Sequence, residues 1–148
     1  MSGDPVEPVQ TPCVCATLRM ATRAVSRVYD EALAPFGLRT TQYSILARLD
    51  ADGPATVGRL AARLVMDRTT LAREARPLVA AGLAAEEPGA DRRQRILSLT
   101  EEGRSRLEAA RPGWREAQRL VRERLGRERA KGLVGELHAL VGTLARDG

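Results

Sequence analysis

The chain has 148 residues, a formal net charge of +5, and only one Trp, two Tyr and one Phe. It contains no apolar run near the ~18 residues of a membrane span, no charged-then-apolar leader and no disulfide framework, because Cys13 and Cys15 are its only cysteines. We therefore expect a soluble, cytoplasmic and mostly helical protein, whose basic excess attracts polyanions such as nucleic acid.

Residues 1–12 carry three prolines among polar residues and show no periodicity, so we expect a mobile N-terminal arm. Residues 13–148 are long enough for a single domain. Its first element is an amphipathic helix from about Cys15 to Leu33, which Pro35 and Gly37 end.

A second helix is expected next, with Thr40 or Thr41 as its N-cap and the loop at 50–54 as its end. Thr56 is the expected N-cap of a short third helix. A fourth helix should follow from about Arg68 to Ala81.

The fourth helix has clear local signals at both ends. Asp67 is a suitable N-cap, and Gly82 supplies the C-terminal stop. Pro77 lies inside the pattern, so a kink or an early loosening is expected there.

Two strands are expected after this helix pair. Leu83–Pro88 and Arg95–Leu99 have strand character, and Gly89–Arg93 forms the turn between them. The stretch 56–100 therefore predicts a helix-turn-helix with an attached β-hairpin, an arrangement suited to one DNA groove and its neighbour.

Thr100 is expected to cap a long helix that bends near Pro112 and Gly113. A last helix should run from about Arg129 to Leu144. Its leucines recur at coiled-coil spacing and favour pairing of two chains, whereas the alternative is packing on the chain's own first helix. This stripe consists of Leu133, Leu137, Leu140 and Leu144.

A helix that enters the major groove needs a short polar face at its N-terminal end. The residues expected to contact DNA are Arg68, Thr69, Thr70, Arg73 and Arg76 on the fourth helix, and Arg92, Arg93 and Arg95 at the hairpin. Arginine binds either guanine edges or phosphate, and both roles stay open for Arg68 and Arg73. The alternative is a solvated basic face without a partner.

This central stretch resembles the winged helix of MarR-type transcriptional regulators. The run 91–100, DRRQRILSLT, is similar to that family's acidic-Arg-Arg…Leu-Thr pattern, and the preceding helix pair ends in Ala81-Gly82-Leu83 as members do. The resemblance implies a mostly α fold with a winged helix-turn-helix over 38–100 and dimerisation helices over 13–37 and 101–148.

The same resemblance implies a homodimer on a pseudo-palindromic operator in double-stranded DNA. It further implies a repressor that is released by a small aromatic or phenolic ligand or by cysteine oxidation. Family members insert a wing arginine into the minor groove. We expect Arg92 to be that residue, with Arg93 and Arg95 bound to phosphate or to Asp91.

Cys15 is expected at the start of the first helix, where unpaired N–H groups favour a thiolate. The peroxide-sensing branch of the family has a reactive cysteine at this place, and Tyr29 matches a tyrosine of that branch, although Arg19 and Thr40 replace two others. Cys13 is placed to resolve a sulfenate on Cys15 of a partner chain. The alternatives are an inert buried thiol and a thiol that packs around a ligand pocket.

Catalysis has no support in the sequence. No phosphate-binding glycine loop or nucleophile elbow occurs, and His138 is the only histidine. Cys13, Cys15 and His138 lack the spacing of metal ligands, so we expect no metal, no cofactor and no enzyme. The competing functions are a peroxide-scavenging enzyme that uses Cys15 and a helical protein-interaction adaptor.

Overall fold

The computed structural model describes residues 6–145, so the first five residues of the expected N-terminal arm lie outside the described part. Residues 6–12 contain no helix or strand. The elements are α1 (Val14–Leu33), η1 (Ala34–Phe36), α2 (Thr40–Asp52), β1 (Ala55–Thr56), α3 (Val57–Arg63), α4 (Arg68–Ala80), β2 (Ala84–Pro88), β3 (Arg95–Leu99), α5 (Glu101–Leu125) and α6 (Arg127–Leu144).

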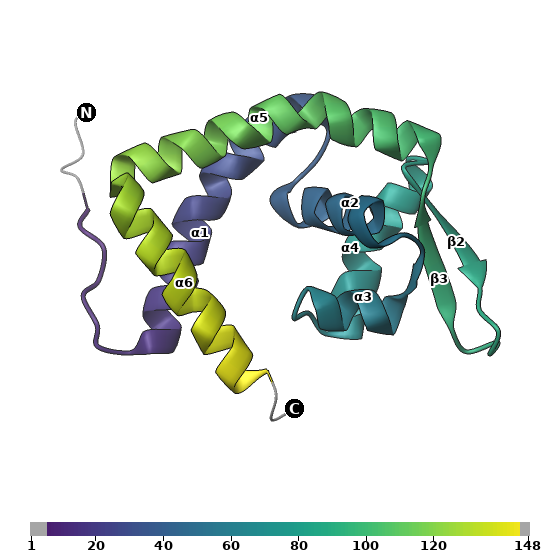
Figure 1. The fold of residues 1–148 in the computed structure, drawn as a ribbon, viewed down its shortest axis with the longest axis horizontal. Helices are drawn as coiled ribbons and strands as arrows, with labels where there is room; N and C mark the ends of the chain where they lie inside the picture. Colours follow the sequence, from purple (N-terminus) through teal and green to yellow (C-terminus); the bar gives the residue numbers. More distant parts are fainter. Residues whose placement is uncertain (1–5, 146–148) are drawn as a thin grey trace.

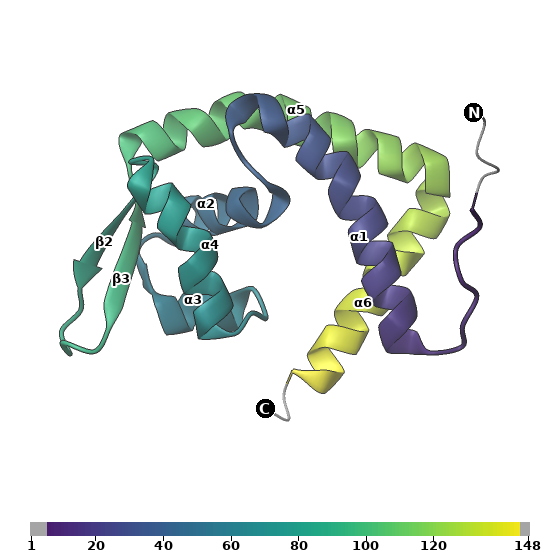
Figure 2. The same cartoon turned by 180° about the vertical axis from the view of Figure 1, so that it is seen from behind.

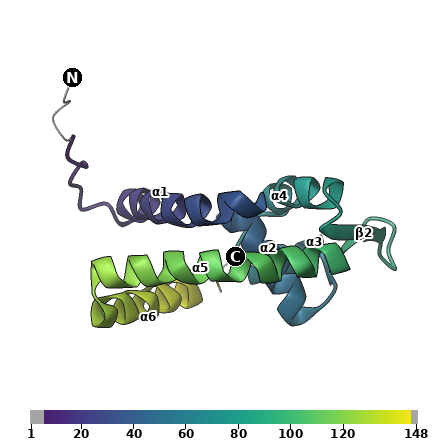
Figure 3. The same ribbon diagram turned by 90° about the horizontal axis from the view of Figure 1, so that it is seen from above.

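The long helix α5 arches over the molecule and joins two units (Figure 1). Helices α2, α3 and α4 and the sheet, which we together call the winged unit, lie under one end of α5. Helices α1 and α6 lie under the other end. From behind, α1 descends from α5 beside the winged unit (Figure 2). Seen from above, α1 and α6 lie on opposite sides of α5 (Figure 3).

The core sits in the winged unit. Helices α2, α3 and α4 and strand β3 each turn an apolar face inward, and the first half of α5 closes that core. Its fully buried side chains include Ile45, Leu46, Leu60, Leu71, Leu78, Leu97 and Leu107. The expected mostly α winged-helix fold is confirmed.

The two outer helices contribute little to this core. On α1 only Tyr29 and Leu33 are buried, and Val25 on the predicted amphipathic helix remains 40% exposed. On α6, Leu133 and Leu144 are exposed and Ala130 alone is buried among the described residues. Two of the four leucines of the stripe are therefore exposed in the single chain, whereas Leu137 and Leu140 are half-buried.

Three predicted N-caps are confirmed, because each depends on one local side chain. Thr56, Asp67 and Thr100 accept hydrogen bonds from the backbone N–H three residues on, at 3.2, 2.8 and 3.0 Å. The prediction for α2 was wrong. Arg39 is its N-cap, and Thr40 is already helical because its hydroxyl and N–H both bind Asp30.

The start of α1 lies one residue before the predicted start, and its end is the predicted one. Cys13 is the N-cap, and its sulfur accepts from the N–H of Ala16 at 3.5 Å, so Cys15 lies inside the first turn. Both thiols are exposed in the single chain.

Neither internal proline ends its helix. Helix α4 continues past Pro77 to Ala80, because Leu71, Ala75 and Leu78 hold it against the core. Helix α5 continues through Pro112 and is drawn as a continuous arch (Figure 1). Proline removes one backbone N–H, and tertiary packing outweighs that loss in both helices.

The sheet is antiparallel with the order β1-β3-β2. The predicted hairpin is present, with Ala84 opposite Leu99 and Pro88 opposite Arg95. Strand β1 was missed, because two residues carry no periodicity. It places Ala55 opposite Leu97 and so attaches the start of α3 to the hairpin.

We predict that Gly103→Ala destabilises the fold. A Cβ at Gly103 would lie 1.9 Å from the carbonyl oxygen of Leu83, which is backbone and cannot swing away. The expected loss is about 3 kcal/mol or more of unfolding free energy, measured by urea denaturation. Gly135→Ala is the control, because nothing lies within 4 Å of a Cβ added there. Equal stability of the two variants would contradict this packing.

Candidate nucleic-acid interface

The start of α4 is fixed by Asp67 and Thr70. The N–H of Thr70 donates to Asp67 at 2.8 Å and its hydroxyl donates at 2.6 Å. The hydrogen bond from the Thr70 hydroxyl, and to a smaller extent the one from its N–H, hold the pKa of the Asp67 carboxyl below its usual value. Thr70 was expected to contact DNA, but its hydroxyl is occupied by this cap.

The outer face of α4 is basic. Leu71, Ala75 and Leu78 are buried, so the remaining positions of the helix point away from the core. The exposed members of the predicted set on this helix are Arg68, Thr69, Arg73 and Arg76. Four of the five predicted side chains on α4 are therefore free of the core and available to a polyanion.

Gly58 on α3 was not predicted to matter, yet it shapes this face. A Cβ at Gly58 would lie 3.1 Å from Nε of Arg68, so the Arg68 side chain lies directly against the start of α3. A glycine in the first turn of a helix is a poor helix former, and that was the available signal.

A groove of about 630 Å³ lies between α4, the start of α3 and the hairpin. It brings together six of the eight predicted DNA contacts, namely Arg68, Thr69, Arg73, Arg76, Arg93 and Arg95. Gln94 also lines it and was missed by sequence reasoning. Glu86 is the acidic residue of the lining, so the groove is strongly cationic.

Arg92 and Arg93 form the tip of the wing. The N–H of Gln94 donates to the carbonyl of Asp91 at 2.9 Å, which makes these arginines the two central residues of a β-turn. The Asp91 carboxylate accepts the backbone N–H of Arg93 at 3.1 Å rather than a guanidinium. Within residues 6–145, neither tip arginine forms an ion pair.

Arg95 differs from the tip residues. Its Nε donates to the Glu86 carboxylate across the hairpin, in an ion pair of β2 and β3. Its charge is thus partly neutralised before any DNA arrives. Arg95 was expected to bind phosphate or Asp91, but in the free protein its partner is Glu86.

The residues predicted for oxidant or ligand sensing do not form one site in a single chain. Cys13 and Cys15 lie at the exposed start of α1, whereas Tyr29 lies near its end. Fourteen helical positions separate Cys15 from Tyr29, which corresponds to about 21 Å.

Tyr29 belongs instead to an aromatic cluster at the junction of α1, α2 and α5. Its ring lies 6.4 Å from that of Trp114, which stacks on Tyr43 at 5.9 Å. The Tyr29 hydroxyl forms a hydrogen bond with Gln118. Burial raises the pKa of Tyr29, and nearby Arg122 partly offsets this effect.

The sequence profile of the MarR family matches residues 36–94, the winged unit. An HTH-type transcriptional regulator of Bacillus subtilis, YwoH, is 29% identical over 91 residues. That alignment covers 62% of this chain and 66% of YwoH, so the chain spans just under two thirds of this relative.

Two solved structures extend the similarity to nearly the full chain. The M. tuberculosis transcriptional regulator MosR, in complex with DNA, is 36% identical with a TM-score of 0.76, and the match covers 88% of this chain and 97% of MosR. The transcriptional repressor CouR, bound to a 23-mer duplex, is 25% identical with a TM-score of 0.78 and coverage of 91% and 99%. Among the residues that the structure describes, no helix is long and apolar enough to cross a membrane.

We predict that the wing arginines contribute unequally to DNA binding. Arg92→Ala should reduce the slope of log affinity against log salt by about one per protomer, because a free guanidinium releases about one counterion. Arg95→Ala should reduce it less, because Glu86 already neutralises this side chain. Fluorescence anisotropy on a labelled duplex measures both. Arg119→Ala, in an ion-pair network on α5, is the control. Equal slopes for the two wing variants would refute the unequal contribution.

Proposed function

This chain belongs to the MarR family of DNA-binding transcriptional regulators, and we propose that it acts as a homodimeric repressor of a pseudo-palindromic operator. Members of the family are regulators rather than enzymes, which confirms the expectation of no enzymatic activity and removes the peroxide-scavenging alternative. The observation that carries the proposal is the cationic groove between α4 and the wing.

The dimer is supported by the exposed apolar surface of the outer helices. Leu133, Val134, Val141 and Leu144 on α6 and Val14 and Val25 on α1 are all at least 40% exposed. Surfaces of this kind usually meet a partner. Residues 13–37 and 101–148 would then pair the chains, and 38–100 would bind DNA.

The groove suits a two-groove mode of binding. Arg68, Thr69 and Arg73 at the N-terminal half of α4 would enter the major groove, with Arg76 on phosphate. The β-turn carries Arg92 outward, so this residue would enter the adjacent minor groove, where a narrow width favours arginine. A two-fold axis would place the second copy about one DNA turn away.

Oxidation of a cysteine is one candidate trigger of release. Cys15 is exposed in the first turn of α1, where an oxidant can reach its sulfur. A sulfenate formed there by a peroxide could be resolved by Cys13 of the partner, with water as the leaving product. Such a bond would alter the paired helices and thereby the spacing of the two copies of α4.

A small aromatic or phenolic ligand is the other candidate trigger. A hollow of about 650 Å³ lies at the elbow of α5 and α6, lined by Trp114, Gln118 and Arg122 among others. An aromatic face next to guanidinium groups suits an aromatic acid or phenolate. A ligand that binds more tightly when the two copies of α4 are spaced wrongly for the operator would increase the population of dimers that cannot bind DNA.

We predict that wild-type protein prefers a palindromic duplex from its own upstream region over a scrambled duplex. Leu133→Glu should yield monomers in sedimentation and bind the palindrome at least tenfold more weakly, because it places a charge in the apolar stripe. Ala139→Glu adds the same charge on another face of α6 and should remain dimeric. A wild type without duplex preference and with a flat salt dependence would refute DNA regulation and favour the adaptor.

We predict that peroxide releases wild-type protein from the palindrome and that Cys15→Ser resists it. Anisotropy of the labelled duplex follows release across a peroxide titration, and added thiol should restore binding. Equal release from both proteins would exclude Cys15 as the trigger. A wild type that stays bound at all peroxide concentrations would favour the small-molecule ligand.

A further inference from the structure

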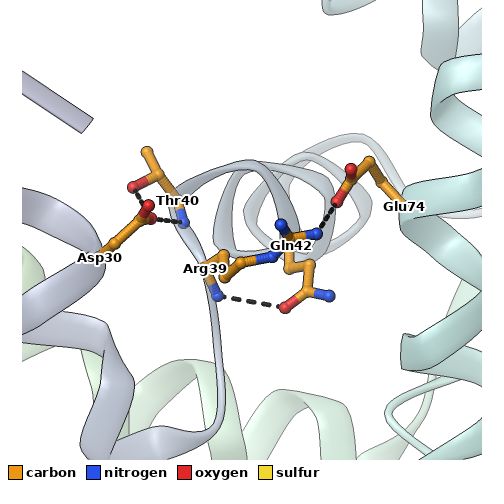
Figure 4. A network of polar contacts seen from close by, with 5 residues as sticks. All are labelled: Asp30, Arg39, Thr40, Gln42 and Glu74. Atoms are coloured by element: carbon orange, nitrogen blue, oxygen red, sulfur yellow. Dashed lines mark hydrogen bonds and ion pairs between the residues drawn. The ribbon is translucent and has the colours of Figure 1, made fainter. Parts of the chain in front are cut away.

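Polar contacts at the N-terminus of α2 link α1 to α4 (Figure 4). At one end, Oδ1 of Asp30 on α1 accepts the N–H of Thr40 at 2.7 Å and its hydroxyl at 2.6 Å. The carboxylate thereby satisfies the first N–H of α2, where the helix dipole also favours an anion. Asp30 ties α1 to the start of α2.

At the other end, Nη2 of Arg39 donates to Glu74 of α4 at 2.7 Å. The side chain of Gln42, which is buried, accepts the backbone N–H of Arg39 at 3.1 Å and so fixes the residue that carries this guanidinium. Arg39 immediately precedes Thr40 in the chain. The two sets of contacts are joined by the peptide bond between Arg39 and Thr40, so this short segment of chain links α1 to α4.

The accessibility of the two partners shows which one needs the other. The Glu74 side chain is only 14% exposed, whereas that of Arg39 is 62% exposed. The Glu74 carboxylate has lost most of its contact with water, and the hydrogen bond from Arg39 offsets part of that loss. Glu74 does not line the cationic groove between α4 and the hairpin, so its role differs from that of the arginines beside it.

Few other polar contacts reach α4. The ion pairs of Asp50 with Arg104 and Arg111 join α2 to α5 and do not involve it. Within residues 6–145, Arg39–Glu74 is the one side-chain hydrogen bond or ion pair between α4 and another element. The α4 side chains that are buried in the core, Leu71, Ala75 and Leu78, are apolar, and apolar contacts are non-directional. Hydrogen bonds are directional, so this pair limits rotation and sliding of α4.

We propose that Asp30, Arg39 and Glu74 are positioning residues that set the orientation of α4 relative to α1, and with it the half-site spacing the dimer accepts. The inference rests on the proposed dimeric operator binding. Because α1 belongs to the paired region, a fixed angle between α1 and α4 fixes the separation of the two copies of α4. The network thus determines which operators fit rather than how strongly the protein attracts DNA.

The test measures affinity for a series of palindromic duplexes whose half-sites are moved together or apart by one base pair. Wild type should bind one spacing best. Glu74→Gln keeps the shape of the side chain and removes its charge, and its preference for that spacing should fall about fivefold to tenfold. Asp30→Asn, at the opposite end of the network, should flatten the spacing profile in the same way.

Glu87→Gln is the matched control. It removes the same negative charge from the winged unit, lies on the exposed wing and forms no ion pair among the described residues. It should raise affinity for all duplexes alike and leave the spacing profile unchanged. The charge-exchanged double variant Arg39→Glu with Glu74→Arg should recover most of the spacing preference, whereas each single reversal should not.

A double-mutant cycle between Asp30→Asn and Glu74→Gln then tests whether the two ends act together. Loss of spacing preference in both single variants, with no further loss in the double variant, supports the proposal. Uniform weakening on every duplex with the wild-type profile retained would overturn it, because the pair would then contribute only to stability or charge. If wild type itself shows no spacing preference, the proposed operator binding fails as well.

Discussion

Helix α5 has to pack against two units at once, and small residues make this possible. Gly103 lies so close to the carbonyl of Leu83 that no side chain fits between the wing and α5. Further along, a Cβ at Gly113 would lie 2.7 Å from the carbonyl of Ala32 on α1. Both junctions place backbone on backbone. The winged unit and α1 are consequently held by close-packed contacts that have little room to adjust.

This rigid attachment holds the exposed arginines of the winged unit at fixed positions relative to α1. Several arginines are used internally, such as Arg104 and Arg111 on Asp50. Arg92 and Arg93 instead project from a β-turn, and Arg73 lies on the exposed side of α4. A cationic surface attracts any polyanion, but a cationic surface on a fixed frame can also match one DNA geometry.

Features that depend on one side chain and its nearest backbone were predictable. Thr56, Asp67 and Thr100 cap their helices as expected, because an N-cap needs only a short polar side chain and an N–H three residues away. The hairpin was also predictable, because its two strands are neighbours along the chain and a short turn joins them. Features that depend on distant residues were not, such as strand β1, which exists because β3 offers it partners.

The sequence by itself determined the order of the α-helices and the hairpin, the apolar faces of α2 and α4, and the basic residues that point away from those faces. Only the tertiary structure decided how these side chains are used. Asp30 takes the N–H of Thr40 and displaces the expected cap of α2, and Glu86 neutralises Arg95 across the hairpin. Local patterns follow from neighbours along the chain, whereas each of these partners is supplied by another element of the fold.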